Sequence, residues 1–201
     1  MLTLYHCPMS RSTRLVQLVD ELGAGDRVKI ETVTIVRQDG SGAADHRNPH
    51  PEGKVPLLVH DGVEIWESTA IALYLTELFP EAGLGVPPGD PLRGRYLSWL
   101  AWYGDVLEPL VVLDVAGVAH PAFHRTFRSM AEAVARLQAA LAEAEYLVGD
   151  RFTAADLIVA STFGWRPSLT PDDAAVKAWI QRCLARPAAR RAWEADARAA
   201  A

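Results

Sequence analysis

The sequence predicts an N-terminal α/β domain followed by an all-helical domain. In the first 80 residues, short stretches of alternating apolar residues flank helical patterns. Residues 81–90 contain three glycines and two prolines, a composition typical of a linker. Beyond this linker no stretch alternates as a strand does, and helical patterns continue to the end. We therefore expect domains at residues 1–80 and 91–201, joined by 81–90.

The N-terminal domain begins with a strand that leads directly into a helix. Residues 2–5 alternate as in a half-buried strand, and Pro8 follows them. A helical pattern then begins at Ser10, with apolar residues on one face. Cys7, Ser10 and Ser12 stand at this junction. Because the unpaired N–H groups at a helix start favour an anion, we expect the junction to bind or carry one, such as a thiolate.

Three further strands and a second helix are expected in this domain. Residues 28–36 are rich in β-branched residues, and the strand–helix–strand order predicts that they pair in parallel with the first strand. Residues 38–52 are predicted to form a loop. Residues 54–59 form the next strand, which Asp61-Gly62 turns into a short return strand. The second helix then runs up to Pro80.

Helices are expected throughout the second domain, with a kink at Pro109 in the first of them. The predicted ranges are residues 91–118, 123–146, 154–163, 172–186 and 188–201.

Composition excludes several classes of function. The net charge of −5 argues against a nucleic-acid partner, which needs a basic face. No apolar run approaches the roughly 18–20 residues of a membrane span. The first ten residues contain no Lys or Arg, so no secretory signal is expected. Two cysteines far apart, Cys7 and Cys183, predict a reduced cytoplasmic protein.

Three motifs give the chain a family resemblance. They are Ser-Arg-Ser-Thr-Arg at residues 10–14, Asn-Pro-His-Pro-Glu-Gly-Lys-Val-Pro at 48–56, and Glu-Ser-Thr-Ala-Ile at 67–71. With the order of elements, they resemble a cytosolic glutathione transferase of the bacterial, serine-type kind. The resemblance spans the whole chain and implies a thioredoxin-like N-terminal domain and a helical C-terminal domain.

The resemblance also implies residues that bind glutathione. The Val55-Pro56 bond is cis in the family, and the Val55 backbone pairs with the extended backbone of glutathione. Glu67 and Ser68 would hold the γ-glutamyl end, the first at its ammonium and the second at its carboxylate. Lys54 would pair with the glycine carboxylate. The structural alternatives are a proline at a strand start, a helix-capping pair and a solvated lysine.

Ser10 is the expected catalytic residue, because it stands where serine-type members place their hydroxyl. A thiol with an ordinary pKa near 8.5 is mostly protonated at neutral pH, and lowering that pKa by one to two units takes roughly 1.4–2.7 kcal/mol. One hydrogen bond to a charged group supplies about 1.5–3 kcal/mol. The alternative for Ser10 is helix capping. Ser12 and Tyr5 are weaker candidates, within the helix and strand respectively.

Cys7 offers a second mechanism. Cys-Pro-Met-Ser resembles the Cys-Pro-x-Ser of monothiol glutaredoxins, and Cys7 matches the cysteine of cysteine-type transferases. A thiolate at a helix start would make the chain a glutathione-disulfide oxidoreductase. The alternative for Cys7 is an inert buried residue. A non-catalytic glutathione-binding stress protein is the third possibility.

The leading expectation is a cytoplasmic homodimer that conjugates glutathione to small apolar electrophiles in detoxification. The resemblance implies an electrophile pocket built partly from the first long helix. Core packing is expected for most of Trp99, Trp102 and Tyr103, with one of the three facing this pocket. His46/His50 and His120/His124 have metal-like i,i+4 spacing, but each pair has a proline beside it and no third ligand nearby. No metal is expected.

Overall fold

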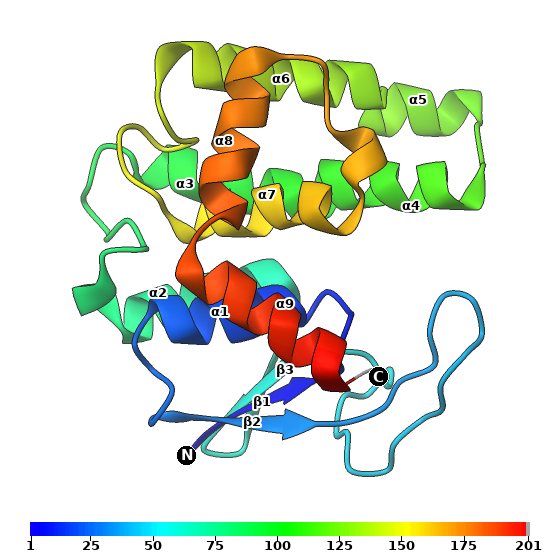
Figure 1. Cartoon of the computed structure of the whole chain (residues 1–201), viewed down its shortest axis with the longest axis vertical. Helices are drawn as coiled ribbons and strands as arrows, with labels where there is room; N and C mark the ends of the chain where they lie inside the picture. Colours follow the sequence, from blue (N-terminus) through cyan, green and yellow to red (C-terminus); the bar gives the residue numbers. More distant parts are fainter. Residues whose placement is uncertain (200–201) are drawn as a thin grey trace. The chain divides into compact units, whose positions relative to one another are not determined.

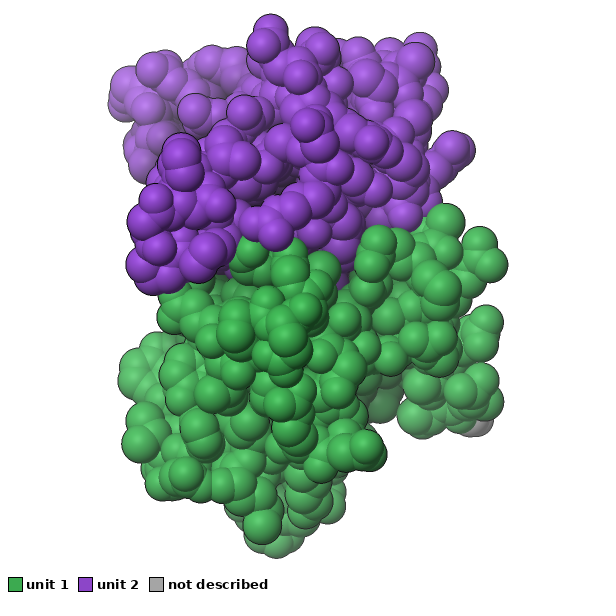
Figure 2. Space-filling model, turned by 90° about the vertical axis from the view of Figure 1, so that its left-hand side faces the viewer, with its two compact units in different colours: residues 1–85, 185–201 green, residues 86–184 purple. Residues whose placement is uncertain are grey.

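The computed structural model describes residues 1–199, which form two compact units (Figure 2). Unit 1 combines residues 1–85 with the C-terminal segment that begins at residue 185, and unit 2 comprises residues 86–184. This division differs from the expected domains, because the last helix groups with the N-terminal half of the chain.

Unit 1 contains a mixed four-stranded sheet in the order β2-β1-β3-β4. β1 and β2 are parallel, whereas β3 is antiparallel to both β1 and β4. The strands are β1 Leu2–His6, β2 Val28–Thr32, β3 Leu57–His60 and β4 Val63–Trp66. The parallel β1–β2 pair confirms the predicted crossover through the first helix.

Two strands are shorter than predicted. β2 ends at Thr32, and one further hydrogen bond, from Val33 N to His6 O at 2.8 Å, ends its contact with β1. β3 begins at Leu57 rather than at residue 54, because Pro56 has no N–H to donate to a ladder.

The β3–β4 connection is the predicted tight hairpin. Asp61 and Gly62 have φ of +48° and +87°. Positive φ at both central residues is the requirement of a type I′ turn, which suits the right-handed twist of the strands.

The helices of unit 1 are α1 Thr13–Glu21, α2 Ser68–Leu78 and α9 Pro187–Ala199, with a short 3₁₀ turn η1 Pro80–Ala82. The predicted helix start at Ser10 is wrong by one turn. Thr13 N donates to Ser10 O at 3.2 Å, so residues 10–13 form a turn that leads into α1. Ser12 is therefore the residue directly before the helix.

α9 runs alongside α1 (Figure 1). Its inner face is built of small residues, Ala188, Ala189 and Ala192, all buried, which lets the two helices approach closely. Arg186 donates to both carboxylate oxygens of Glu21, at 2.7 and 2.6 Å. The start of α9 is thereby fixed to the C-terminal end of α1.

Unit 2 is entirely helical among its described elements. They are α3 Arg93–Trp102, the π-helical turn η2 Tyr103–Leu107, α4 Glu108–Ala116, α5 Pro121–Phe127, α6 Met130–Glu143, α7 Ala154–Trp165, the 3₁₀ turn η3 Pro167–Leu169 and α8 Ala174–Leu184. The interruption expected at Pro109 takes the form of η2. Pro109 cannot donate a helical hydrogen bond, and the wider π turn makes room for its ring.

The single helix predicted over residues 123–146 is wrong. α5 ends at Phe127, and Arg128 has φ +66°. Ser129 then caps α6, accepting from Glu132 N at 3.2 Å while the Glu132 carboxylate accepts from Ser129 N at 3.0 Å. This capping box breaks a pattern that hydrophobic spacing alone reads as continuous.

Asp156 organises the core of unit 2. Its buried carboxylate accepts hydrogen bonds from Thr153 N, Leu147 N and Trp179 Nε1 at 2.8–2.9 Å. Trp179 itself is fully buried, and Cys183 on the same helix is buried as predicted. Among residues 1–199, no helix is both long and apolar enough to cross a membrane.

Candidate active site

The strand register brings the three sequence motifs to one end of the sheet. Tyr5 of β1 pairs with Leu57 of β3, and Leu57 pairs with Trp66 of β4. One end of the sheet therefore carries all three segments: the turn after β1, Pro56 before β3 and Glu67 after β4. A candidate site lies where these three segments leave the sheet.

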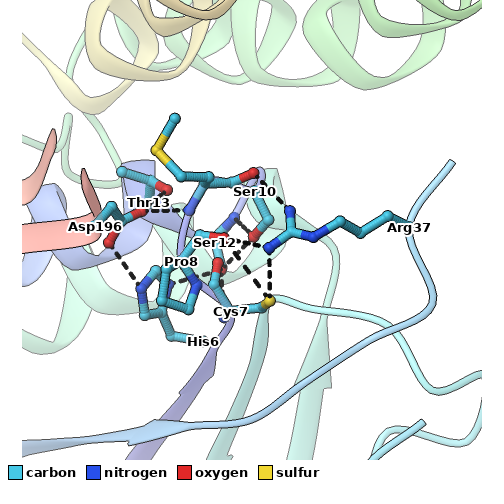
Figure 3. A network of polar contacts seen from close by, with 9 residues as sticks. His6, Cys7, Pro8, Ser10, Ser12, Thr13, Arg37 and Asp196 are labelled. Carbon is cyan, nitrogen blue, oxygen red and sulfur yellow. Dashed lines mark hydrogen bonds and ion pairs between the residues drawn. The ribbon is translucent and has the colours of Figure 1, made fainter. Parts of the chain in front are cut away.

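Ser12 is the centre of a hydrogen-bond network in the turn between β1 and α1 (Figure 3). Its side chain is fully buried, at 0% exposure. Ser12 Oγ lies 2.8 Å from His6 Nδ1 and 2.7 Å from Ser10 Oγ. It also accepts from Cys7 N at 3.1 Å and contacts Cys7 O at 3.3 Å. The turn is thus held from inside by one hydroxyl.

Asp196 of α9 closes the network from the other side (Figure 3). Its carboxylate accepts from Met9 N at 2.8 Å and from Thr13 Oγ1 at 2.5 Å, and lies 3.0 Å from His6 Nε2. Burial alone would raise the pKa of Asp196, but these donors outweigh burial and hold that pKa below its ordinary value. Asp196 is therefore ionised at neutral pH.

Ser10, the predicted catalytic residue, is half-buried at the edge of this network. Its hydroxyl oxygen accepts from Ser12 N at 3.1 Å and contacts Ser12 Oγ. Both of these contacts are made with Ser12. They fix the position of the oxygen just ahead of the α1 N-terminus, where unpaired backbone N–H groups favour an anion.

Cys7 lies in the same turn but is only 4% exposed. Burial raises the pKa of its thiol and outweighs the opposing effect of the Arg37 guanidinium, whose Nη2 lies 3.5 Å from the sulfur. Arg37 also donates to Pro8 O at 2.8 Å and to Met9 O at 3.1 Å. The thiol is thus a poorly ionised group, which disfavours the nucleophilic role.

The Val55-Pro56 peptide bond is cis. Lys54 precedes it on the surface, and its ammonium donates to the Glu52 carboxylate. The Lys54 carbonyl accepts from Asn48 Nδ2 at 3.0 Å, which ties the loop to the start of β3. Lys54 is thus an exposed, ion-paired cation beside Val55.

Glu67 has an unusual backbone conformation, with φ +68° and ψ 126°. Non-glycine residues rarely adopt this region, and such residues cluster at functional sites. Its side chain makes no capping hydrogen bond to α2, which begins at Ser68. The Glu67 side chain therefore does not cap α2.

Two family models match the chain. The model of the glutathione S-transferase N-terminal domain matches residues 1–77, and that of the glutathione S-transferase C-terminal domain matches residues 120–187. Together they span most of both units. The chain belongs to the glutathione S-transferase family.

Individual relatives agree with this assignment. Glutathione S-transferase 3 of Zea mays is 28% identical over 93% of this chain and 90% of its own length. A sphingomonad glutathione S-transferase, solved in complex with glutathione, has a TM-score of 0.78 and 28% identity over 97% of this chain and 98% of that one. The predicted thioredoxin-like and helical fold is thereby confirmed, and the protein is a transferase.

A shorter match has higher identity. Protein LigF of Sphingobium sp. is 44% identical over 54 residues, which make up 26% of this glutathione S-transferase and 21% of LigF. The aligned part thus covers about a fifth of that relative.

Three residues of the candidate site in this transferase cannot be identified from the sequence. Asp196 stands in an alanine-rich helix, 190 positions from its partner His6, and no local pattern links the two. His6 continues the alternating pattern of β1, so the pattern indicates only that it is a strand residue. Arg37 lies in a loop whose course the sequence does not predict.

Proposed function

We propose that this transferase joins the sulfur of glutathione to a small apolar electrophile, with Ser10 stabilising the thiolate. The thiol of glutathione loses its proton to solvent and the thiolate attacks an electrophilic carbon. A carbon–sulfur bond forms, and the leaving group departs with the electron pair of the broken bond. The position of Ser10, in the turn just ahead of α1 and at the sheet end shared with Pro56 and Glu67, is the observation that carries the proposal.

The energetics are sufficient for this role. A hydrogen bond from a hydroxyl to a thiolate contributes about 1.5–3 kcal/mol, and the helix N-terminus adds a few tenths to 1 kcal/mol. Each unit of thiol pKa corresponds to 1.36 kcal/mol, so one such donor lowers the pKa by roughly one to two units. That shift makes a substantial fraction of glutathione ionised at neutral pH.

Glutathione binding is proposed on two further segments, residues 54–56 and 67–68. The backbone of Val55, next to the cis bond, would pair with the backbone of the tripeptide. Ser68, at the α2 N-terminus, would receive the γ-glutamyl carboxylate, and Glu67 its ammonium. Lys54 would attract the glycine carboxylate. The sphingomonad relative, solved with glutathione, supports this assignment of the ligand.

The Cys7-dependent oxidoreductase is the second candidate. Arg37 beside the sulfur favours it, since a guanidinium stabilises a thiolate. Burial of the thiol opposes it and is the larger effect. A non-catalytic glutathione-binding stress protein is the third candidate, against which the transferase names of the relatives argue.

We further propose that the enzyme works as a cytoplasmic homodimer in detoxification, as the serine-type family resemblance implies. Its second substrate would be a small apolar electrophile. A nucleic-acid partner is not proposed, in keeping with the net charge of −5, and neither is a membrane partner. Neither step of the proposed chemistry requires a metal ion.

Ser10→Ala tests the proposal. With glutathione and a chloronitrobenzene acceptor, we expect kcat/KM to fall by about 10- to 100-fold and the pKa of bound glutathione to rise by about one to two units. Ser98→Ala, an exposed serine on α3, is the matched control. Unchanged turnover and thiol pKa in Ser10→Ala would remove Ser10 from the mechanism. Absence of calorimetric binding at millimolar glutathione would remove the whole proposal.

A further inference from the structure

Ser10 is the outer end of a chain of hydrogen-bonded side chains that reaches α9. From Ser10 Oγ the successive contacts are 2.7 Å to Ser12 Oγ, 2.8 Å from there to His6 Nδ1, and 3.0 Å from His6 Nε2 to Asp196 Oδ1. The three inner members are buried, so water does not compete for these contacts. The direction of each hydrogen bond in such a chain depends on its neighbours.

Asp196 determines the first proton position. An ionised carboxylate is only an acceptor, so the atom opposite Asp196 Oδ1, His6 Nε2, must carry a proton. The pKa of Asp196 lies below its ordinary value, which keeps the carboxylate ionised at neutral pH. One proton position on His6 then remains variable, that on Nδ1.

Ser12 has one proton and two lone pairs to share among its neighbours. Cys7 N–H occupies one lone pair at 3.1 Å. The second lone pair can accept either from His6 Nδ1–H or from Ser10 Oγ–H, but not from both. The state of His6 Nδ1 therefore determines whether Ser12 can accept a proton from Ser10.

When His6 Nδ1 carries a proton, it donates to Ser12 Oγ and fills the second lone pair. Ser12 must then donate its own proton, either to Ser10 Oγ at 2.7 Å or to Cys7 O at 3.3 Å. In both cases Ser12 cannot accept from Ser10. The Ser10 proton is left for an acceptor outside the network, such as a bound sulfur.

When His6 Nδ1 carries no proton, the directions reverse. Ser12 donates to Nδ1, which is closer than Cys7 O, and its free lone pair accepts from Ser10. The Ser10 proton is then used inside the network. A glutathione thiolate would face the Ser10 oxygen without a donor.

We propose that His6 is a positioning residue for Ser10, and that the second proton of its imidazole selects whether Ser10 donates outward to the sulfur or inward to Ser12. The inference rests on the function proposed above. Besides His6 and Asp196, the ionisable groups of the network are the Cys7 thiol and, beyond it, the Arg37 guanidinium, while Thr13 on α1 adds only a hydroxyl.

Imidazole ¹⁵N NMR of the ligand-free protein tests the proton positions without using activity. Spectra are recorded from about pH 5 to about pH 9, and we expect any proton that His6 loses to leave Nδ1, while Nε2 keeps its proton against the Asp196 carboxylate. In Asp196→Asn a neutral amide replaces the carboxylate that requires a proton on Nε2, so the preference for that proton position should be lost, while the spectrum of the exposed His46 should not change. Loss of the Nε2 proton first, or no change at Nδ1 over this range, overturns the proposal.

The pH profile of kcat/KM tests the consequence for Ser10. We expect the wild type to lose about tenfold in kcat/KM on the alkaline side, at the pH of the NMR transition, since one hydrogen bond is worth about that factor. Ser12→Ala removes the inward acceptor, so this alkaline loss should disappear. An unchanged alkaline loss in folded Ser12→Ala overturns the proposal.

Asp196→Asn provides a second test if Ser12→Ala fails to fold. The alkaline loss of this variant should occur at the pH of its own NMR transition, and a loss at a different pH overturns the proposal. The two experiments separate this inference from the proposed function. If no conjugation is found, the NMR titration still decides the direction of the relay. If the NMR result is negative, conjugation by Ser10 stands without it.

Discussion

His6 Nε2 lies 3.0 Å from Asp196 Oδ1, and this contact joins the first strand of the protein to its last helix. Both side chains are buried, and Asp196 also receives donors from Met9 and Thr13. A helix from the far end of the sequence thus supplies the only carboxylate in the described network around the candidate catalytic turn. Stability and site geometry should therefore change together when Asp196 is altered.

The stability contributed by Asp196 should depend on pH in the acid range. Its pKa is lower in the folded protein than its ordinary value, so the contribution is complete above about pH 4 and is lost as pH falls through the folded pKa. Asp196→Asn should lower the free energy of unfolding by about 2–4 kcal/mol at pH 6. The difference from wild type should shrink steadily below about pH 4 in urea unfolding.

Asp172→Asn is the matched control for that measurement. Asp172 is exposed and paired with Lys177, so its replacement should leave the free energy of unfolding nearly unchanged. A wild-type-minus-Asp196→Asn difference that is constant from about pH 6 to about pH 3 would contradict the lowered pKa.

Glycine at position 67 should separate stability from binding. Glu67 has φ +68°, a conformation that costs a non-glycine residue about 1–3 kcal/mol and glycine far less. We expect Glu67→Gly to leave the free energy of unfolding unchanged or up to about 1 kcal/mol higher, and to weaken glutathione binding by calorimetry. Glu64→Gly, on β4 with an ordinary backbone, should instead destabilise by about 0.5–1 kcal/mol. Equal destabilisation by both changes would count against strain at Glu67.

Removing the Lys54 ammonium should raise the KM for glutathione with little change in kcat. An exposed charge pair contributes up to about 1 kcal/mol, so Lys54→Ala should raise KM by about three- to fivefold. Lys177→Ala is a close control, because Lys177 is also exposed and also paired with an acidic neighbour. A KM that is the same in both variants would leave Lys54 as a solvated surface residue.

Cys7 should be a slow nucleophile. Burial raises the pKa of its thiol despite the nearby guanidinium, so alkylation at neutral pH should be slower in the native protein than in urea and should accelerate with pH. A Cys183→Ala background makes Cys7 the sole cysteine for this measurement. Reduction of a glutathione mixed disulfide that Cys7→Ser abolishes would instead establish the oxidoreductase.

Local chemistry made much of unit 1 predictable. Asp61-Gly62 predicts its hairpin because both residues tolerate positive φ, and the strand–helix–strand order predicts the parallel pair. The sequence does not distinguish Ser10 from Ser12 as the residue before α1, because serine suits a capping position at either place. The α5–α6 break does have a local signal, the capping box of Ser129 and Glu132, which hydrophobic spacing alone does not include.

The site was only partly predictable for a different reason. Ser10, Pro56 and Glu67 lie in motifs a few residues long, so the sequence could single them out. Asp196 owes its role to the packing of α9 against α1 through small alanine side chains. The sequence of an alanine-rich helix does not indicate which earlier segment of the chain the helix packs against.

The placement of α9 also sets an order of events during synthesis. His6 leaves the ribosome 190 residues before Asp196, an interval of roughly 10–40 s at ordinary rates of translation. All of unit 2 is made within that interval. A nascent chain can therefore form the sheet and the turn around Ser12 early, but the carboxylate that completes the turn arrives only after the helical unit has emerged.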